Sequence, residues 1–340
     1  MMKKILAAAI VSAFAAPAFA ATANVDVYGK LHMAVSMFDD QDAATNDVQV
    51  SSTASRIGFK GAEDLGGGLS AIWQVEQTVV LDEGSGNFAT RNSFIGLKGG
   101  FGTALVGRHD TPLKSVGRKV DLFGDTLADS RNVMNGGSDT RANNALVYVS
   151  PNISGLSFAG AYVTDLGNSV TGAADVGVDR DNRSVYNLSA TYANGPLFLG
   201  LGYGDGDGHE AADLGKHMRA AAGFTMAGLK FVAQFDKLDD ETPLVGNGDY
   251  EAWMVGAAYT MGNIVLKANY MDGDYDVAAD PTQWTIGADY KLSKRTTAYA
   301  LYAQGENITF GSGAGSSDKV KNAAGQEDIS ILSLGMIHTF

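Results

Sequence analysis

The chain has 340 residues, of which 45% are hydrophobic and 19% are charged, and its formal net charge is −13 at pH 7. Because it has no cysteine, it can form neither a disulfide framework nor a thiolate metal site, and its acidic balance excludes a basic surface for nucleic acid. No hydrophobic run reaches the ~18 residues that a transmembrane helix needs, which excludes a helical membrane protein.

The first twenty residues have the pattern of an export signal. Lys3 and Lys4 precede an apolar run, and Ala18-Phe19-Ala20 has the small-x-small form of a cleavage site. We therefore expect residues 1–20 to be a cleaved signal peptide and residues 21–340 to form a single mature domain in a bacterial envelope. Loss of the two lysines leaves 23 basic and 38 acidic residues, a net charge of −15.

From Val25 onward, apolar residues alternate with polar ones. Val25, Val27 and Leu31 share one parity, whereas Lys30 and His32 lie on the other. A period of two indicates strands with one apolar and one polar face. About sixteen such segments can be counted, near residues 25–37, 54–62, 68–80, 91–99, 102–110, 142–150, 155–164, 184–193, 196–205, 216–226, 228–237, 250–261, 264–273, 282–292, 296–306 and 329–340.

The lengths of these segments and of their connections favour a membrane barrel. Most are longer than the ~5–6 residues of an average strand and match the ~9–11 that a tilted strand needs to cross a bilayer. Tight turns such as Gly99-Gly100 and Gly262-Asn263 alternate with long connections such as 165–183 and 307–328. Short periplasmic turns and long extracellular loops are typical of an all-β, antiparallel transmembrane barrel of the outer membrane.

Such a sheet has to close on itself, because unpaired backbone groups are not tolerated in hydrocarbon. The final segment ends at Phe340, an aromatic residue on the apolar parity of its strand. We interpret Phe340 as the signal that the barrel-assembly machinery recognises, and expect the last strand to pair with the first.

Several stretches together resemble the Gram-negative general porin family, whose members are trimeric and sixteen-stranded. The resemblance is carried by VDVYGK at Val25–Lys30, SRIGFKGAEDLG at Ser55–Gly66, GLSAIWQVE at Gly68–Glu76, RNSFIGLKG at Arg91–Gly99, FGTALVGR at Phe101–Arg108 and NALVYVSP at Asn144–Pro151. It implies a water-filled channel for small hydrophilic solutes and ions, and a homotrimer in the outer membrane. We expect neither enzymatic activity nor a cofactor.

Sixteen strands enclose a lumen roughly 30 Å wide, so something has to narrow it. The longest connection, Thr111–Arg141, has 31 residues and follows the fifth segment, where the family places its constriction loop. By the resemblance, Lys30, Arg56 and Arg91 are wall cations that face loop carboxylates, and Arg141 matches a fourth such position. The loop offers Asp121, Asp125 and Asp129, followed by Asp139, but it lacks a Pro-Glu-Phe-Gly-Gly stretch. Which aspartate reaches the constriction therefore stays open.

Opposite charges across a narrow wet slot favour small polar solutes over apolar ones. With the mature chain at −15, we expect a modest preference for cations. The alternatives are a substrate-selective channel or a surface adhesin. The five histidines are scattered and no Gly-x-Ser-x-Gly motif occurs, so we expect neither a metal site nor a hydrolase. Gly202–His209 has two alternating carboxylates that could bind Ca²⁺ weakly, but a hydrated loop is the better interpretation.

Overall fold

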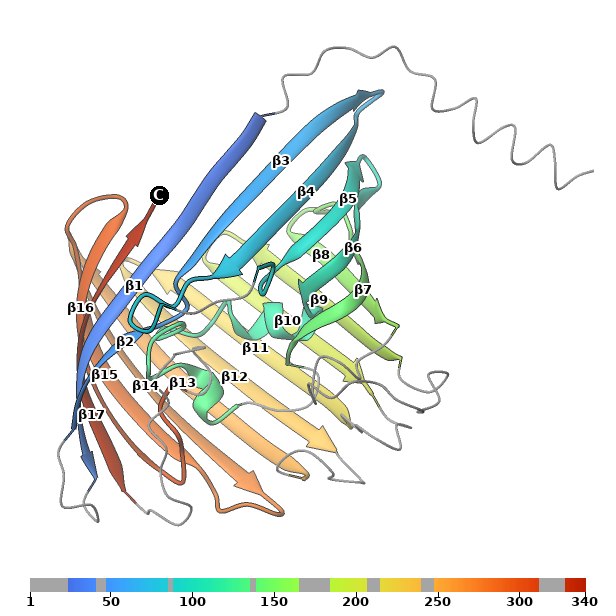
Figure 1. Ribbon diagram of the computed structural model, residues 1–340. Helices are drawn as coiled ribbons and strands as arrows, with labels where there is room; N and C mark the ends of the chain where they lie inside the picture. The colour runs from blue at the N-terminus through green and yellow to red at the C-terminus, as the bar shows by residue number, and fades with distance from the viewer. Residues whose placement is uncertain are drawn as a thin grey trace, which may run out of the picture.

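The computed structural model describes residues 24–40, 47–84, 88–134, 139–164, 184–206, 215–239, 248–311 and 328–340. Most of them lie in one antiparallel sheet that curves round into a barrel (Figure 1). The predicted fold class is confirmed. The predicted signal peptide, residues 1–20, lies outside the described residues.

The strands are β1 (Asn24–Asp40), β2 (Asp47–Ser52), β3 (Arg56–Gly66), β4 (Leu69–Thr78), β5 (Ser93–Gly99), β6 (Gly102–Asp110), β7 (Arg141–Val149), β8 (Leu156–Val163), β9 (Val185–Asn194), β10 (Leu197–Asp205), β11 (Lys216–Met226), β12 (Leu229–Asp239), β13 (Tyr250–Met261), β14 (Ile264–Tyr275), β15 (Thr282–Lys291), β16 (Thr296–Glu306) and β17 (Ile329–Thr339). Each pairs with the next along the chain from β3 onward.

The first connection differs from the prediction. Residues 33–38 of β1 pair with β2, and residues 24–30 pair with β3. β2 and β3 therefore follow each other along the same side of β1 and together form one strand of the barrel wall. The strand is interrupted at Ala54, whose φ is +50°. The seventeen strands therefore occupy sixteen positions around the barrel. The alternating pattern misses β2 because it is only six residues long.

The barrel closes where β17 pairs with β1, from Lys30 opposite Thr339 to Asp40 opposite Ile329. Beyond this ladder, Gly29 N–H donates to Phe340 O at 3.0 Å, and Phe340 N–H donates to Gly29 O at 3.1 Å. The Phe340 ring lies over Gly29, where a Cβ atom would come within 2.5 Å of the ring carbon Cζ. A glycine at position 29 is what allows the ring to cover the seam.

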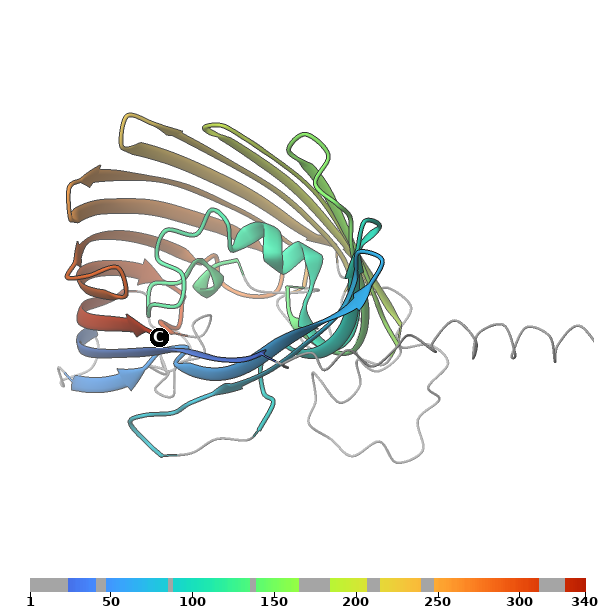
Figure 2. The same ribbon diagram turned by 90° about the horizontal axis from the view of Figure 1, so that it is seen from above.

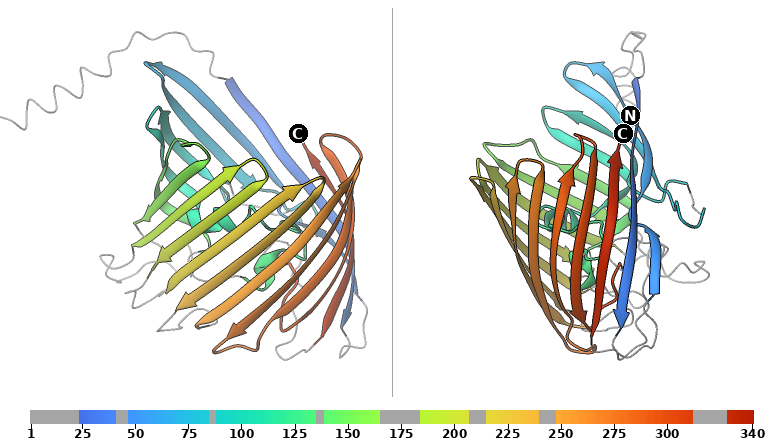
Figure 3. Two further views of the ribbon diagram at one scale, coloured as in Figure 1. Left: turned by 180° about the vertical axis from the view of Figure 1, so that it is seen from behind. Right: turned by 90° about the vertical axis from the view of Figure 1, so that its left-hand side faces the viewer.

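The two faces of the wall have the parity that the sequence predicts. Val25, Val27 and Val35 are about half exposed on the outer face, whereas Lys30 and His32 are buried on the inner one. The tight turns lie at one rim (Figure 3). In one of them Ala227 and Gly228 both have positive φ, +50° and +83°, which is the geometry of a type I′ hairpin turn.

The connection from β6 to β7 folds into the barrel instead of extending beyond its rim (Figure 2). We call residues 111–140 the inner loop. It begins with the short helix α2 (Pro112–Gly117), whose N-cap Thr111 accepts a hydrogen bond from the N–H of Lys114, and continues to the 3₁₀ turn η1 (Ser130–Asn132). The helix packs against β9, β10 and β11. No helix among the described residues has the length and apolarity required to cross a membrane.

The seam generates a first prediction. Deletion of Phe340 removes both terminal hydrogen bonds and the ring that covers Gly29, so the barrel should close less stably. After refolding from urea into lipid vesicles, we expect a smaller fraction with heat-modifiable electrophoretic mobility. The matched control is Phe101→Ala, which removes another exposed aromatic ring at a tight turn. Equal folded fractions for the deletion and the wild type would contradict the role of this contact.

Candidate pore constriction

The inner loop meets the barrel wall at Lys30 and Arg56. These two residues are opposite each other in the β1–β3 register, so both cations come from one patch of wall. The Lys30 Nζ atom lies 2.7 Å from Asp125 Oδ2, and Arg56 Nη1 lies 3.4 Å from the same oxygen. The structure therefore brings two of the predicted wall cations together with one predicted loop carboxylate, and they are in direct contact.

Asp125 is held in a precise orientation by its own loop. Its φ is +65°, a left-handed conformation that aspartate tolerates better than most residues. Its N–H donates to Asp129 Oδ2 at 2.8 Å, and Arg118 Nη2 lies 2.5 Å from Asp125 Oδ1. Although burial by itself raises the pKa of this carboxyl, Arg118, Lys30 and Arg56 together hold the pKa well below its usual range. Asp125 is therefore ionised at physiological pH.

Asp121 and Asp129 face the interior of the loop and do not contact the wall cations. Asp121 accepts hydrogen bonds from the N–H of Phe123 at 2.9 Å and from Ser130 Oγ at 3.0 Å. Asp129 accepts from Arg118 Nη1 at 2.8 Å and from Arg131 Nε at 3.1 Å. Their carboxylates are almost fully buried. They brace the loop, and Arg118 links them to Asp125.

Arg91 has a partner on the wall itself. Its Nε atom lies 2.6 Å from Glu76 Oε1, and the hydroxyl of Tyr28 donates to Glu76 Oε2 at 2.9 Å. Arg56 Nε is 4.0 Å from the same carboxylate. Sequence reasoning missed Glu76, although its parity could have indicated it: Glu76 pairs with Gly58, which pairs with Tyr28 on β1.

Arg141 stands apart from this cluster. It lies at the start of β7, where its Nη2 atom is 3.1 Å from Asp110 Oδ1 and its Nε donates to Asn92 Oδ1 at 2.7 Å. Lys114 of the inner loop approaches the same Asp110 oxygen at 3.8 Å. Within the described part of the chain, Arg141 contacts none of the three loop aspartates. The predicted wall cations thus divide into a cluster at Asp125 and a second one at Asp110.

The opposite side of the loop is anchored by a buried arginine. Arg219 on β11 lies 2.6 Å from Asp139 of the loop and donates to Asp236 Oδ1 on β12 at 2.8 Å. It also donates to the carbonyl of Leu113 at 3.3 Å. Gly117 makes this approach possible, because a Cβ there would come within 2.5 Å of Arg219 Nη1. Neither Arg219 nor Arg118 was among the predicted residues.

Further contacts continue this attachment along the wall. Gln283 on β15 donates to the carbonyl of Ala128 at 3.0 Å and accepts from Asn132 at 2.9 Å. The Lys267 ammonium lies 4.7 Å from the centre of the Phe123 ring. The inner loop is therefore fixed to β11–β15 on one side and presents Asp125 to β1 and β3 on the other, so it crosses the lumen.

The sequence analysis also considered metal binding. The described residues contain no group of three or more histidine, aspartate or glutamate side chains arranged to hold a metal ion. In the Gly202–His209 stretch, residues 207–209 lie outside the described residues.

The anchor provides a second prediction. In Arg219→Met, Asp139 and Asp236 stay buried without their cation, which costs about 3–5 kcal/mol when a buried pair is broken. Urea unfolding in vesicles should show this loss, and protease should cut the inner loop of the folded barrel. In the control Lys237→Met, only exposed ion pairs with Asp239 and Glu251 are lost, and because such pairs are screened by water the stability should change little. A loss no larger than the control's would refute the anchoring role.

A third prediction concerns pH. Burial, with the nearby Asp129 carboxylate, raises the pKa of Asp121 to about 6. The folded state therefore binds this proton more tightly than the unfolded state, so the contribution of Asp121 to stability is greatest below about pH 4 and is lost as the pH rises to about 6. In Asp121→Asn this decline should vanish. If the urea unfolding midpoints of wild type and variant change with pH in the same way between these pH values, the pKa of Asp121 is not raised.

Known proteins share both the sequence pattern and the architecture. A profile of the Gram-negative porin family matches residues 7–331. The major outer membrane protein P.IB of Neisseria meningitidis is 32% identical over 317 residues, which covers 87% of this chain and 91% of that protein. The P.IB protein of Neisseria gonorrhoeae is 28% identical over 336 residues, with 87% and 92% covered.

Solved structures have the same fold. An anion-selective porin from Comamonas acidovorans superposes with a TM-score of 0.76 at 24% identity, covering 94% of this chain and 100% of that one. The outer membrane protein OmpT of Vibrio cholerae, described in a trimer form, has a TM-score of 0.65 at 19% identity, with 94% and 99% covered. Because the family profile matches residues 7–331, this chain belongs to the Gram-negative porin family and is a β-barrel protein of the outer membrane.

Proposed function

We propose that the chain forms a passive, water-filled channel for small hydrophilic solutes and ions, and that its narrowest section lies where Asp125 meets Lys30 and Arg56. The observation that carries the proposal is the placement of an ionised loop carboxylate against two wall cations by a loop that crosses the lumen. Fixed charges of both signs in a narrow slot favour hydrated, polar solutes.

The other predicted site residues take supporting positions in this proposal. Arg91, paired with Glu76, extends the charged wall next to Arg56. Arg141 belongs to the Asp110 cluster at the loop's entry into the lumen. Asp121 and Asp129 bind Arg118, and Arg118 in turn holds the Asp125 carboxylate in place at the constriction.

We further propose a weak preference for cations. The charges around the constriction nearly cancel, since five cations face four carboxylates: Lys30, Arg56, Arg91, Arg118 and Arg131 against Glu76, Asp121, Asp125 and Asp129. The net charge of −15 on the mature chain therefore resides elsewhere and attracts cations toward the mouths within a Debye length of ~8 Å. The structurally similar porin from Comamonas is named as anion-selective. The measurement of ion selectivity therefore has to distinguish a preference for cations from a preference for anions.

The decisive experiment is reconstitution in a planar bilayer. Stepwise conductance is expected, and silence at every voltage would rule out the channel. Under a KCl gradient, the reversal potential should indicate modest cation preference. Asp125→Ser should shift it toward anions, and Arg56→Ser with Arg91→Ser should shift it toward cations. Lys237→Ser, at an exposed ion pair, is the control. If neither variant moves the potential, the constriction lies elsewhere although the channel stands.

We also propose that the protein assembles as a homotrimer in outer-membrane lipid and that its C-terminal strand is read by the barrel-assembly machinery. The trimeric form of the Vibrio relative supports the first part, and the mass of the detergent-solubilised complex tests it. Phe340 at the seam supports the second. If the machinery reads Phe340, its deletion should lower the folded yield in cells more than it lowers refolding in vesicles.

A further inference from the structure

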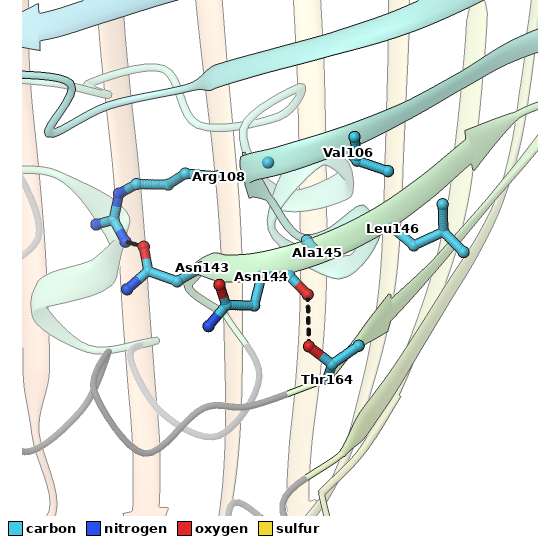
Figure 4. A pocket seen from close by; sticks show the side chains of 8 residues that line it. Val106, Arg108, Asn143, Asn144, Ala145, Leu146 and Thr164 are labelled. Atoms are coloured by element: carbon cyan, nitrogen blue, oxygen red, sulfur yellow. Dashed lines mark hydrogen bonds between the residues drawn. The ribbon is translucent and has the colours of Figure 1, made fainter. Parts of the chain in front are cut away.

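A hollow lies on the wall at β6 and β7, away from the constriction (Figure 4). Its volume is about 690 Å³, within the ~300–1,000 Å³ of ligand pockets, and it is lined by Val106, Gly107, Arg108, Asn143, Asn144, Ala145, Leu146 and Thr164. Nothing in the proposed channel uses these side chains.

The hollow opens on the outer face of the barrel. Val106 and Leu146 are partners in the β6–β7 register and are 49% and 51% exposed, as expected for side chains that face lipid. Arg108 follows Val106 on the same face of β6, and β6 ends two residues later at Asp110. This end of β6 leads into the inner loop, at the rim opposite the tight turns. In an outer-membrane barrel that rim faces the cell exterior.

An irregularity in the sheet brings polar groups to this otherwise apolar face. The register of β6 and β7 shifts between Gly107 and His109, so that Asn143 and Asn144 both lie opposite Arg108. Asn144 has a φ of +50°. Such bulges re-aim side chains, and Figure 4 shows Arg108, Asn143, Asn144 and Thr164 together beside the hollow.

Arg108 differs from the arginines of the lumen. Arg56, Arg91 and Arg141 each lie within 4.0 Å of a carboxylate oxygen. Among the described residues Arg108 has no such partner. Its Nε donates to the carbonyl of Thr90 at 3.0 Å and its Nη1 donates to Asn143 Oδ1. These bonds use two of the five N–H donors of a guanidinium, which leaves a cation with donors to spare on the membrane side of the wall.

We propose that this hollow binds a phosphate-bearing lipid of the outer leaflet, with the phosphate on Arg108 and an acyl chain along Val106 and Leu146. A guanidinium pairs with phosphate through parallel charge-assisted hydrogen bonds. The position of Arg108 along the bilayer normal fits as well, since an arginine on the lipid face is strongly destabilising at the bilayer midplane but costs little near the membrane–water interface. The hollow thus offers a cation at headgroup level and an apolar wall below it.

Native mass spectrometry of the folded protein in detergent tests this assignment. The probes are a bisphosphorylated glucosamine lipid (lipid A), the same lipid without its phosphates, and inorganic phosphate. Wild type should retain the phosphorylated lipid with a Kd about tenfold below that of Arg108→Gln, as loss of a charge-assisted contact implies. Arg108→Lys should fall between them, because lysine cannot pair in the bidentate way. Arg295→Gln, at the opposite rim, should bind like wild type.

Any of three outcomes would overturn the proposal. The first is equal binding of the phosphorylated and dephosphorylated lipids by wild type, a comparison that needs no variant to fold. The second is equal affinity of wild type and Arg108→Gln with the folded state of both shown by heat-modifiable mobility. Displacement of the lipid by equimolar inorganic phosphate would show that the acyl chain contributes nothing and would likewise refute a lipid site.

Discussion

Every other feature of this protein depends on the pairing of β1 with β17. A sheet in hydrocarbon cannot leave an edge of unpaired backbone groups, and here the eleven paired positions between these strands remove the last edge. The seam is completed by the exchange of two hydrogen bonds between Gly29 and Phe340. Lys30 lies in this seam, opposite Thr339. The strand that closes the barrel therefore also carries the first cation of the constriction.

Closure creates a lumen, and the inner loop occupies it because the wall supplies partners for its buried charges. A carboxylate such as Asp139 would be costly to bury alone. Arg219 on β11 forms ion pairs both with Asp139 and with Asp236 on the neighbouring strand β12. Arg118 has the same function within the loop, where it contacts Asp121, Asp125 and Asp129. These two arginines convert a polar segment into a rigid partition, and the position of Asp125 follows from that rigidity.

The division of charge between lumen and outer face has a physical logic. In the lumen, cations are matched by carboxylates, so that polar solutes meet a strong local field with little net charge. On the outer face near β6 and β7, Arg108 has no carboxylate oxygen within 4.0 Å among the described residues, although Asp110 attracts it from a greater distance, and it is adjacent to apolar side chains. The same residue type therefore serves different partners: protein carboxylates inside the barrel, and by our proposal lipid phosphate outside it.

The alternation of Val25, Val27 and Leu31 with Lys30 and His32 was enough to assign the two faces of a strand, because a period of two depends only on local geometry. The turn spacing and the terminal Phe340 likewise predicted the closed barrel. The length of 111–141, together with the resemblance to porins, which have their constriction loop after the fifth strand, predicted the inner loop. The sequence did not reveal β2, nor that Asp125 and not Asp121 or Asp129 contacts Lys30. The sequence analysis also did not identify Arg118, Glu76 and Arg219 as the partners that hold the site, although the parity of Glu76 could have indicated it. These depend on contacts between segments far apart in the chain: the loop is fixed at Arg219, more than one hundred residues from Leu113, and only that attachment decides which aspartate reaches the wall.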